Sequence, residues 1–571
     1  MLNVSDIKNA LKDRWVQVRA LRGIIMQDFV SVQCEPVAPR LKPPSKYESL
    51  GRQLGTITSF LSDESWSTYT LAGIILFSLL FATGAALTRR PWCDEAWFAS
   101  IGYNLDHHGF MGMTVLDPHG YIFHPNVEGI DRYTYWVMPG YLLMQAAWYK
   151  VVGLSLFSMR SISIFFGGVA LLSWYVVVRW LTGDRSIALL TAFLLGTEQH
   201  FAFSAATGRM DMMCAALGLV APALYIRLRQ NFTLALFVAS CVSAINLFTH
   251  PNAIFGVLAV AVIVLYFDRN RLSTRALLLA FCPFLLLGAL WGLYGAQAPH
   301  FLVAQFQAQS RVPHRLELPW NPWKSFWQEI ELRYGSAYGL NRAFPISLNS
   351  IIVALYVVAI ITALGVSQIR RQTGTRVVLI LTAVAFTLLM CFQKNWYYLV
   401  FIIPYYAAVL AIASTWFWRR YLSYRVVVVS LLGLFTIVQL SVVGFRIVHN
   451  DYRNRFLEAT NFLKSNAKPG DLIMGSGELA FQLGFEGQVL DDSRLGFLSG
   501  KKPEFIVIEA HYRDFWLPTL AAYEPATFRY IQDLFYNKYE LVYDQTYDGY
   551  KTFGFSDRPY QILQRRPVPL H

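Results

Sequence analysis

Long apolar runs recur along this chain, and they constrain its fold more than any other feature of the sequence. A transmembrane helix needs about 20 apolar residues to cross about 30 Å of hydrocarbon. Runs near that length lie at 70–87, 160–181, 186–204, 211–227, 231–249, 251–267, 275–295, 346–366, 376–392, 396–415 and 424–446. The pattern predicts a polytopic α-helical membrane protein with about 11 transmembrane helices.

The composition supports a membrane protein over a set of soluble domains, since 55% of the 571 residues are hydrophobic and only 15% are charged. The formal net charge of +13 could indicate a nucleic-acid-binding protein. However, Lys and Arg cluster in the short segments between apolar runs, as topology signals do, so we expect no nucleic-acid partner. The six cysteines are dispersed and indicate neither a disulfide framework nor a zinc site.

The short run 139–152 determines the predicted topology, because a span at this point would invert the side of everything after it. At about 1.5 Å per residue it reaches only about 21 Å, so we interpret it as a helix lying on the membrane. Most short-loop arginines then share the side of the N-terminus, which predicts a cytoplasmic N-terminus in the inner (plasma) membrane. Arg89 and Arg90 fall on the outer side, where they either weaken this topology or bind phosphate.

The predicted topology divides the chain into three parts. Residues 1–66 form a cytoplasmic extension, since they lack the apolar region of a signal peptide. Residues 67–446 form the transmembrane domain, with long outer loops at 88–159 and 296–345. Residues 447–571 form a small extracytoplasmic α/β domain. Its expected elements are a helix at 451–465 and strands at 471–474, 505–508 and 539–543.

Two neighbouring acids, Asp94 and Glu95, follow the first apolar run by about one helical turn. A carboxylate at this depth can be perturbed by apolar surface and still be reached by a water-soluble reactant, which suits a general base. Alternatively, Asp94 caps the amphipathic stretch 95–108. In a helix Glu95 would point about 100° away from Asp94, so we expect it to orient the site or bind a metal.

Polar residues from other segments reach the same outer surface on this topology. Each one alone could simply end a helix or extend to the membrane interface. Their convergence on one surface favours a shared site, and the long outer loops and helix-end charges favour a surface enzyme over a transporter. These further candidates are Arg209, Asp211, His250, Arg311, His314, Arg315, Lys394 and Tyr397.

Four motifs, in their order and spacing over about residues 68–415, resemble the polytopic C-type glycosyltransferases that use polyprenyl-phosphate sugars. This family includes protein O-mannosyltransferases, aminoarabinose transferases of lipid A and related bacterial enzymes. Where the family usually has Pro-Pro before the surface helix, this chain has Met138-Pro139. The motifs are Trp92-Cys93-Asp94-Glu95-Ala96, the segment from Met138-Pro139-Gly140 to Met159-Arg160-Ser161, Arg209-Met210-Asp211, and Lys394-Asn395-Trp396-Tyr397-Tyr398.

The resemblance implies that Asp94 and Asp211 are the acids of the first and second outer loops, and that Lys394 is the lysine before a tyrosine-rich helix. Because a phosphate leaving group needs no proton, the residue types predict a base, Asp94, and cations on the phosphate. Those cations would be Lys394 with Arg311, Arg315 or Arg209. One displacement implies inversion at the anomeric carbon.

The predicted partners are the membrane, a polyprenyl-phosphate sugar donor and a lipid, glycan or protein acceptor. No cofactor is indicated, although Asp94 and Asp211 are also candidate ligands of a divalent metal. Two alternatives are a transporter or flippase, and a ligase that transfers a lipid-linked oligosaccharide. Asp491-Asp492 could also be taken for a nucleotide-sugar metal motif, but a turn in the outer domain is favoured.

Overall fold

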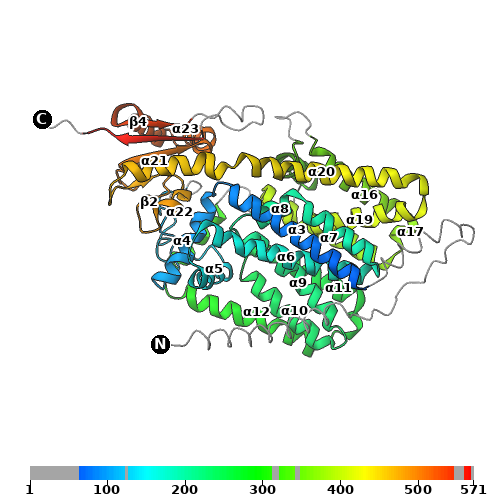
Figure 1. Cartoon of the computed structure of the whole chain (residues 1–571). Helices are drawn as coiled ribbons and strands as arrows, with labels where there is room; N and C mark the ends of the chain where they lie inside the picture. The colour runs from blue at the N-terminus through cyan, green and yellow to red at the C-terminus, as the bar shows by residue number, and fades with distance from the viewer. Residues whose placement is uncertain (1–63, 122–125, 312–320, 341–347, 546–558, 568–571) are drawn as a thin grey trace, which may run out of the picture.

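The chain forms a bundle of helices with a small sheet-containing domain at one end (Figure 1). The computed structural model describes residues 64–121, 126–311, 321–340, 348–545 and 559–567. Nearly all of the predicted cytoplasmic extension lies outside these ranges.

The helices of the bundle follow the predicted apolar runs. Six described helices are long and apolar enough to cross a membrane, and four more are apolar but shorter. The polytopic helical fold is therefore confirmed, while the count of spanning helices stays a prediction. The main helices are α3 (Glu64–Thr88), α6 (Leu156–Thr182), α9 (Met210–Leu228), α10 (Phe232–Leu247), α11 (Ile254–Phe267), α12 (Thr274–Gly295), α16 (Ser350–Gly365), α18 (Thr373–Cys391), α19 (Ile403–Arg420) and α20 (Arg425–His449).

Three predicted helices are interrupted near one end. The run 186–204 divides at Glu198, whose carboxylate accepts hydrogen bonds from the first backbone N–H groups of the next helix. Such capping starts a new helix inside an apolar run. The interrupted helices are α7 (Arg185–Thr197) with α8 (Gln199–Ala205), η1 (Pro251–Ala253) with α11, and η4 (Trp396–Phe401) with α19. Three short elements connect other helices of the bundle: η2 (Arg269–Arg271), α17 (Ser367–Arg370) and η5 (Leu422–Tyr424).

The two long loops that are predicted to lie on the outer side, 88–159 and 296–345, contain helices of their own. The predicted surface helix is α5, with Pro139 at its first position and Gly153, at φ 79°, after its last. Its position on the membrane surface stays a prediction. The loop elements are α4 (Cys93–His107) and α5 (Pro139–Val152), then α13 (Pro299–Ser310), α14 (Pro322–Gln328), the π-helical η3 (Glu329–Tyr334) and α15 (Gly335–Tyr338).

The C-terminal domain, which we call the outer domain after its predicted location, contains a mixed sheet with strand order β2-β1-β3-β5-β4. In this sheet β1 pairs in parallel with β2 and β3, while β5 runs antiparallel to β3 and β4. The three expected strands are confirmed, and the sequence analysis missed two others, β2 and β5. The elements are η6 (Tyr452–Leu457), α21 (Glu458–Asn466), β1 (Ile473–Met474), η7 (Gly477–Leu479), α22 (Ala480–Leu483), β2 (Val489–Leu490), β3 (Phe505–Glu509), η8 (Tyr512–Trp516), α23 (Leu517–Tyr523), α24 (Pro525–Asp533), η9 (Leu534–Lys538), β4 (Tyr539–Asp544) and β5 (Tyr560–Arg565).

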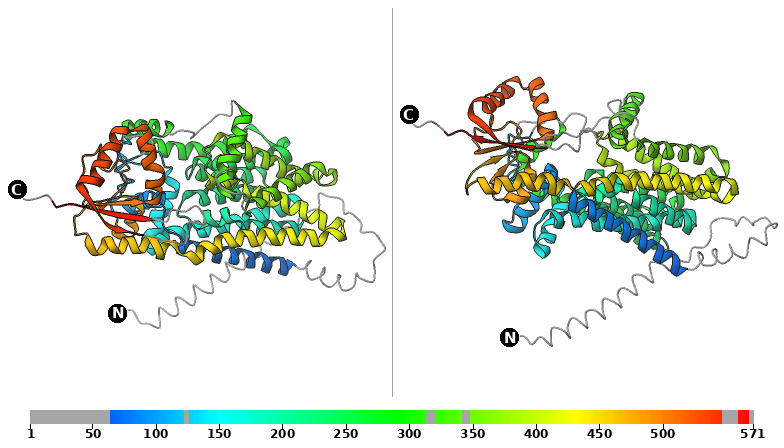
Figure 2. Two further views of the ribbon diagram at one scale, coloured as in Figure 1. Left: turned by 90° about the horizontal axis from the view of Figure 1, so that it is seen from above. Right: turned by 45° about the horizontal axis from the view of Figure 1, so that its top comes forward.

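The outer domain is docked onto the first outer loop (Figure 2). Leu116 forms a parallel bridge with Asp491, whose backbone N–H donates to the carbonyl of Val115 at 2.7 Å. The Lys501 ammonium pairs with Asp117 at 2.8 Å. The outer domain thus holds the loop that carries Asp94.

Close packing of α9 against α11 depends on two glycines. A Cβ atom added at Gly256 would lie 2.5 Å from the Cα atom of Gly218. Small residues at a crossing of membrane helices let the two backbones approach. Helix α9 carries Asp211, and His250 lies just before η1 and α11. The close approach of the two helices therefore also sets the relative position of these two candidate site residues.

We expect Gly256→Ala to destabilise the protein by about 1–3 kcal/mol, because overpacking forces the two helices apart. Thermal unfolding in detergent measures the effect. Gly292→Ala in α12 is the matched control, since a Cβ atom there would meet nothing within 4 Å. Equal melting of Gly256→Ala and wild type would contradict this account of the crossing.

Candidate active site

Glu95 lies fully buried in an ion pair with Arg160. Its Oε1 accepts hydrogen bonds from Arg160 Nε at 2.8 Å and from the Gly208 N–H at 2.6 Å. Its Oε2 accepts from Arg160 Nη2 at 2.7 Å and from the Trp92 N–H at 2.9 Å. Burial raises the pKa of Glu95, but Arg160, together with Arg89 and the Gly208 N–H, lowers it below its usual value. Trp92 is the N-cap residue of α4, and the side chain that accepts its N–H is that of Glu95 and not that of Asp94, which corrects the capping alternative.

Arg160 also closes the end of α3. Its guanidinium donates to the carbonyls of Ala86 at 2.6 Å, Arg89 at 2.8 Å and Arg90 at 3.0 Å. These acceptors belong to the last turn of the helix and the residues after it, where carbonyls lack partners within the helix. One buried ion pair thus joins α3, α4, α6 and the turn before α9.

Asp94 and Asp211 share one guanidinium, that of Arg209. Arg209 forms an ion pair with Asp94 through Nη1 and with Asp211 through Nε at 2.8 Å. The Asp94 side chain remains 22% exposed, whereas that of Asp211 is buried. Asp211 Oδ1 has no hydrogen-bond partner among the described residues. Two carboxylates and one guanidinium give this acidic cluster a formal charge of −1, with one carboxylate accessible.

Aromatic side chains enclose Arg209. Its Cζ lies 4.4 Å from the ring centre of Tyr397, 5.0 Å from that of Trp92 and 5.9 Å from that of Phe98. Trp92 and Tyr397 also meet edge to face at 5.7 Å. A guanidinium is stabilised over aromatic faces, most when it is desolvated. The predicted candidates Asp94, Arg209, Asp211 and Tyr397 are therefore brought together.

Lys394 lies in a second, basic cluster with two residues that sequence reasoning missed. Its Nζ is 3.3 Å from Glu329 Oε2, and Glu329 also pairs with Arg333. Both partners belong to η3 in the second outer loop, where their i,i+4 spacing was the only available signal. Two cations and one carboxylate give the cluster a formal charge of +1. Arg333 also donates to the carbonyls of Leu389, Gln393 and Asn395, and Lys394 to that of Met390.

Two tyrosines separate the acidic cluster from the basic cluster. Tyr397 lies against Arg209, and its ring centre is 4.6 Å from that of Tyr398. Tyr398 in turn lies 5.9 Å from Arg333 Cζ and 6.1 Å from the ring of His250. The two clusters of opposite charge therefore lie on opposite sides of one aromatic pair.

The other predicted candidates lie at the edge of this arrangement. His250 caps η1, with its Nδ1 accepting from the Asn252 N–H at 3.0 Å. Arg311 lies at the exposed C-terminal end of α13, and no hydrogen bond or ion pair between described residues joins it to either cluster. His314 and Arg315 fall in the stretch 312–320, outside the described residues.

The arrangement of Asp94 and Asp211 does not fit a divalent metal, because the Arg209 guanidinium holds both carboxylates. The described part of the chain contains no group of three or more His, Cys, Asp or Glu residues that could hold a metal ion. We therefore derive no catalytic step through a metal.

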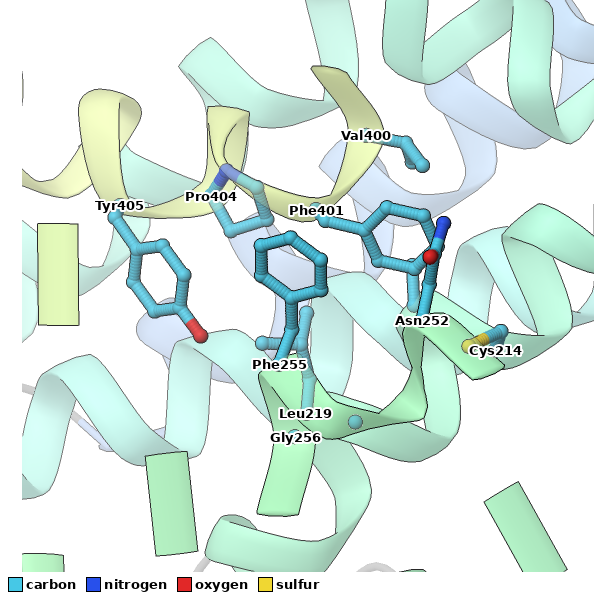
Figure 3. Close-up of a pocket in the computed structure, with 11 residues that line it drawn as sticks. Cys214, Leu219, Asn252, Phe255, Gly256, Val400, Phe401, Pro404 and Tyr405 are labelled. Atoms are coloured by element: carbon cyan, nitrogen blue, oxygen red, sulfur yellow. The ribbon is translucent and has the colours of Figure 1, made fainter. Parts of the chain in front are cut away.

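A small, mostly apolar pocket adjoins the site (Figure 3). Three segments line it, and these segments also carry Asp211, His250 and the tyrosine pair. The Asn252 Nδ2 atom is buried and has no hydrogen-bond partner among the described residues. The lining residues are Cys214, Ala215, Gly218 and Leu219 of α9, Asn252, Phe255 and Gly256 of η1 and α11, and Val400, Phe401, Pro404 and Tyr405 of η4 and α19.

Carboxylates of the outer domain hold both sides of the Asp94 turn. Arg90 pairs with Glu509 at 2.9 Å and lies 3.6 Å from Glu478, while Trp97 Nε1 donates to Asp491 Oδ2 at 2.9 Å. Burial raises the pKa of Glu478 to about 8 and that of Asp491 to about 7. The folded state therefore favours the protonated forms of these two acids.

Comparisons with known proteins identify the fold. No protein-family model and no curated protein matches the chain. ArnT from Cupriavidus metallidurans bound to undecaprenyl phosphate has a TM-score of 0.54 and 13% identity, covering 86% of this chain and 97% of that one. Its apo state has a TM-score of 0.51 at the same identity and coverage. An apo oligosaccharyltransferase from Archaeoglobus fulgidus has a TM-score of 0.49 and 11% identity, covering 77% and 70% of the two chains. At these identities the likeness to ArnT shows a shared fold, which confirms the predicted C-type glycosyltransferase fold.

We expect Glu95→Gln to destabilise the protein by about 3–5 kcal/mol, because it leaves the buried Arg160 without its carboxylate. Thermal unfolding in detergent measures the loss. Asp94→Asn is the matched control, since this neighbouring carboxylate is partly exposed, and it should melt near the wild-type temperature. A large loss in Asp94→Asn, with none in Glu95→Gln, would reverse the assigned roles.

The free energy of unfolding should fall as the pH rises, because the buried Asp491 and Glu478 must then ionise in the folded state. A carboxyl group whose pKa is raised in the folded state contributes stability below its unfolded pKa, and that stability is lost as the pH rises through the folded pKa. For Asp491 and Glu478 the loss therefore occurs between about pH 4 and pH 8. Thermal unfolding at pH 5.5, 7 and 8.5 should show it, and Asp491→Asn should flatten the dependence. A pH-independent wild-type melting temperature would refute this expectation.

Proposed function

We propose that this protein transfers a sugar from a polyprenyl-phosphate donor to an acceptor hydroxyl at the outer face of the inner membrane, with inversion of the anomeric carbon. The observation that carries the proposal is the pair of oppositely charged clusters on the two sides of Tyr397 and Tyr398. Such a transfer needs a base at one end of the reacting bond and cations at the other.

In this proposal Asp94 is the general base. The acceptor oxygen forms a bond to the anomeric carbon, and its proton passes to the partly exposed Asp94 carboxylate. The bond from the anomeric carbon to the phosphate oxygen breaks, and its electron pair stays on the leaving phosphate. A single displacement of this kind inverts the anomeric centre. Arg209 orients Asp94 and Asp211, instead of binding phosphate, because both carboxylates already hold it.

Lys394 would stabilise the charge that grows on the leaving phosphate, and the buried Arg333, which Glu329 and three carbonyls already hold, would position Lys394 through Glu329. Lys394 lies in the short connection between α18 and η4 and is followed by aromatic residues, which in membrane proteins concentrate at the headgroup level. The fold neighbour ArnT was solved bound to undecaprenyl phosphate, which supports a donor of this chemical class. Arg311 and Arg315 remain proposed ligands from the second outer loop.

The proposed topology places the N-terminus in the cytoplasm and residues 447–571 outside. The outer domain would guide acceptors or cover the site, as its contacts with the first outer loop suggest. A lipid, glycan or protein acceptor is compatible with this arrangement.

We expect Asp94→Asn to lower turnover by about 10²-fold or more, because a positioned base contributes that much. Lys394→Ala should lower turnover more than donor binding, since its charge matters most in the transition state. The assay measures free polyprenyl phosphate released from a polyprenyl-phosphate sugar by purified protein, with the nucleotide sugar as a parallel substrate. Exposed Lys324 of α14 supplies the control, Lys324→Ala, which should behave as wild type.

Consumption of the nucleotide sugar, or near wild-type turnover in Asp94→Asn at normal expression, would contradict the proposed function. Passage of unchanged substrate across liposomes would indicate a transporter instead.

A further inference from the structure

Two arginines from different helices converge on one buried ring beside the acidic cluster. Arg89 follows the last residue of α3, and Arg446 lies in the last turn of α20. Their Cζ atoms are 5.9 Å and 4.1 Å from the ring centre of Phe203, which is 2% exposed. The two helices meet at this level (Figure 2), where a Cβ atom at Gly84 would lie 3.1 Å from Ile447 Cδ1.

Arg89 differs from its neighbours Arg160 and Arg90 because it has no carboxylate partner among the described residues. The neighbouring guanidinium of Arg160 is matched by Glu95, and that of Arg90 by Glu509. Arg89 donates to Thr207 Oγ1 at 2.6 Å, but no described carboxylate lies within 4.0 Å of it. Burial lowers the pKa of Arg89 to about 10. Repulsion from neighbouring arginines acts in the same direction, and the charge of Glu95 offsets these effects only in part. A desolvated guanidinium among like charges is stabilised by an anionic ligand.

The position of the two arginines indicates a ligand held in the membrane surface. Leu87, two residues before Arg89, is 52% exposed, and Val448, two residues after Arg446, is 80% exposed. These apolar side chains mark the lipid-facing surface of α3 and α20 at the ends of the two helices. Arginines at such a boundary lie at the depth of lipid headgroups.

The arginine pair adjoins the proposed base but not the proposed donor cluster. The ring of Trp92 contacts Arg89 at 5.9 Å on one side and Arg209 at 5.0 Å on another. Thr207, which accepts from Arg89, lies two residues before Arg209. Trp92 contacts Tyr397, Tyr397 contacts Tyr398, and Tyr398 contacts Arg333 of the basic cluster. Two tyrosines therefore stand between Trp92 and the basic cluster.

We propose that Arg89 and Arg446 bind the anionic group, a phosphate in its simplest form, of a lipid-anchored acceptor, and so place its hydroxyl near Asp94. This inference rests on the proposed sugar transfer for the role of acceptor, but the anion site itself stands on its own geometry. The acceptor is thus a membrane lipid that carries negative charge close to the sugar-accepting hydroxyl.

The first experiment measures binding without any donor. Purified protein in a neutral detergent is titrated with dioleoyl phosphatidic acid, dioleoylglycerol or inorganic phosphate, and bound lipid is counted by native mass spectrometry. We expect the lipid phosphate alone to bind tightly, with Arg89→Gln and Arg446→Gln each weakening it about tenfold or more. Arg425→Gln, at the opposite end of α20, is the matched control and should bind as wild type.

Thermal unfolding and the variants Arg89→Lys and Arg446→Lys, which should keep part of the binding, separate a lost anion contact from a lost fold. Equal binding of phosphatidic acid and dioleoylglycerol, or equal weakening in Arg425→Gln, would overturn the site. Tight binding of inorganic phosphate alone would overturn the assignment to a lipid.

The second experiment tests the acceptor. Membrane lipids of the source cells are divided by anion exchange into neutral and anionic fractions, and each receives labelled sugar from the polyprenyl-phosphate donor. We expect label in the anionic fraction only, with the acceptor KM raised about tenfold in Arg89→Gln and the donor KM unchanged. Label in the neutral fraction, or a raised donor KM, would refute the inference. Failure to release polyprenyl phosphate at all would refute the proposed sugar transfer, while the binding experiment would still decide the anion site.

Discussion

The buried ion pair of Glu95 and Arg160 is the interaction on which the rest of the site depends. Both side chains are fully buried, and each carboxylate oxygen accepts one hydrogen bond from Arg160 and one from the backbone. Burying two charges is costly unless their hydrogen bonds are satisfied, and here the remaining donors of Arg160 close the end of α3. The pair therefore fixes the turn that carries Asp94 relative to α6 and to the start of α9.

Neighbouring positions in the first turn of α4 give two acids different surroundings. Successive residues of a helix point about 100° apart, so Glu95 enters the bundle while Asp94 faces Arg209. The result is a rigid support beside a partly exposed carboxylate. Beyond Tyr397 and Tyr398 the net charge changes sign, from −1 to +1, which matches a reaction that takes a proton at one end and leaves a phosphate at the other.

Much of the fold was predictable because apolar runs of membrane length admit few alternatives. The short apolar run 139–152 was predicted as one helix, and α5 has the same bounds. In contrast, β2 is two residues long, too short to give a pattern, and the break at Glu198 is a single acid inside an apolar run. Asp491 was interpreted as part of a turn, but it lies against Trp97, 394 residues earlier, and no local pattern reports such a contact.

The site was predictable in part for the same reason. The predicted topology brought Asp94, Arg209 and Asp211 to one surface, and the structure joins them to one another and to Tyr397. The predicted topology could not show that two carboxylates hold Arg209. It also could not show that Glu329 pairs with both Arg333 and Lys394.

The most direct measurement is a cryo-EM structure of the protein with a bound polyprenyl-phosphate sugar. The account predicts the donor phosphate within hydrogen-bond distance of Lys394, and the anomeric carbon facing Asp94. A donor phosphate held by Arg89 and Arg446, or a sugar remote from Asp94, would contradict it.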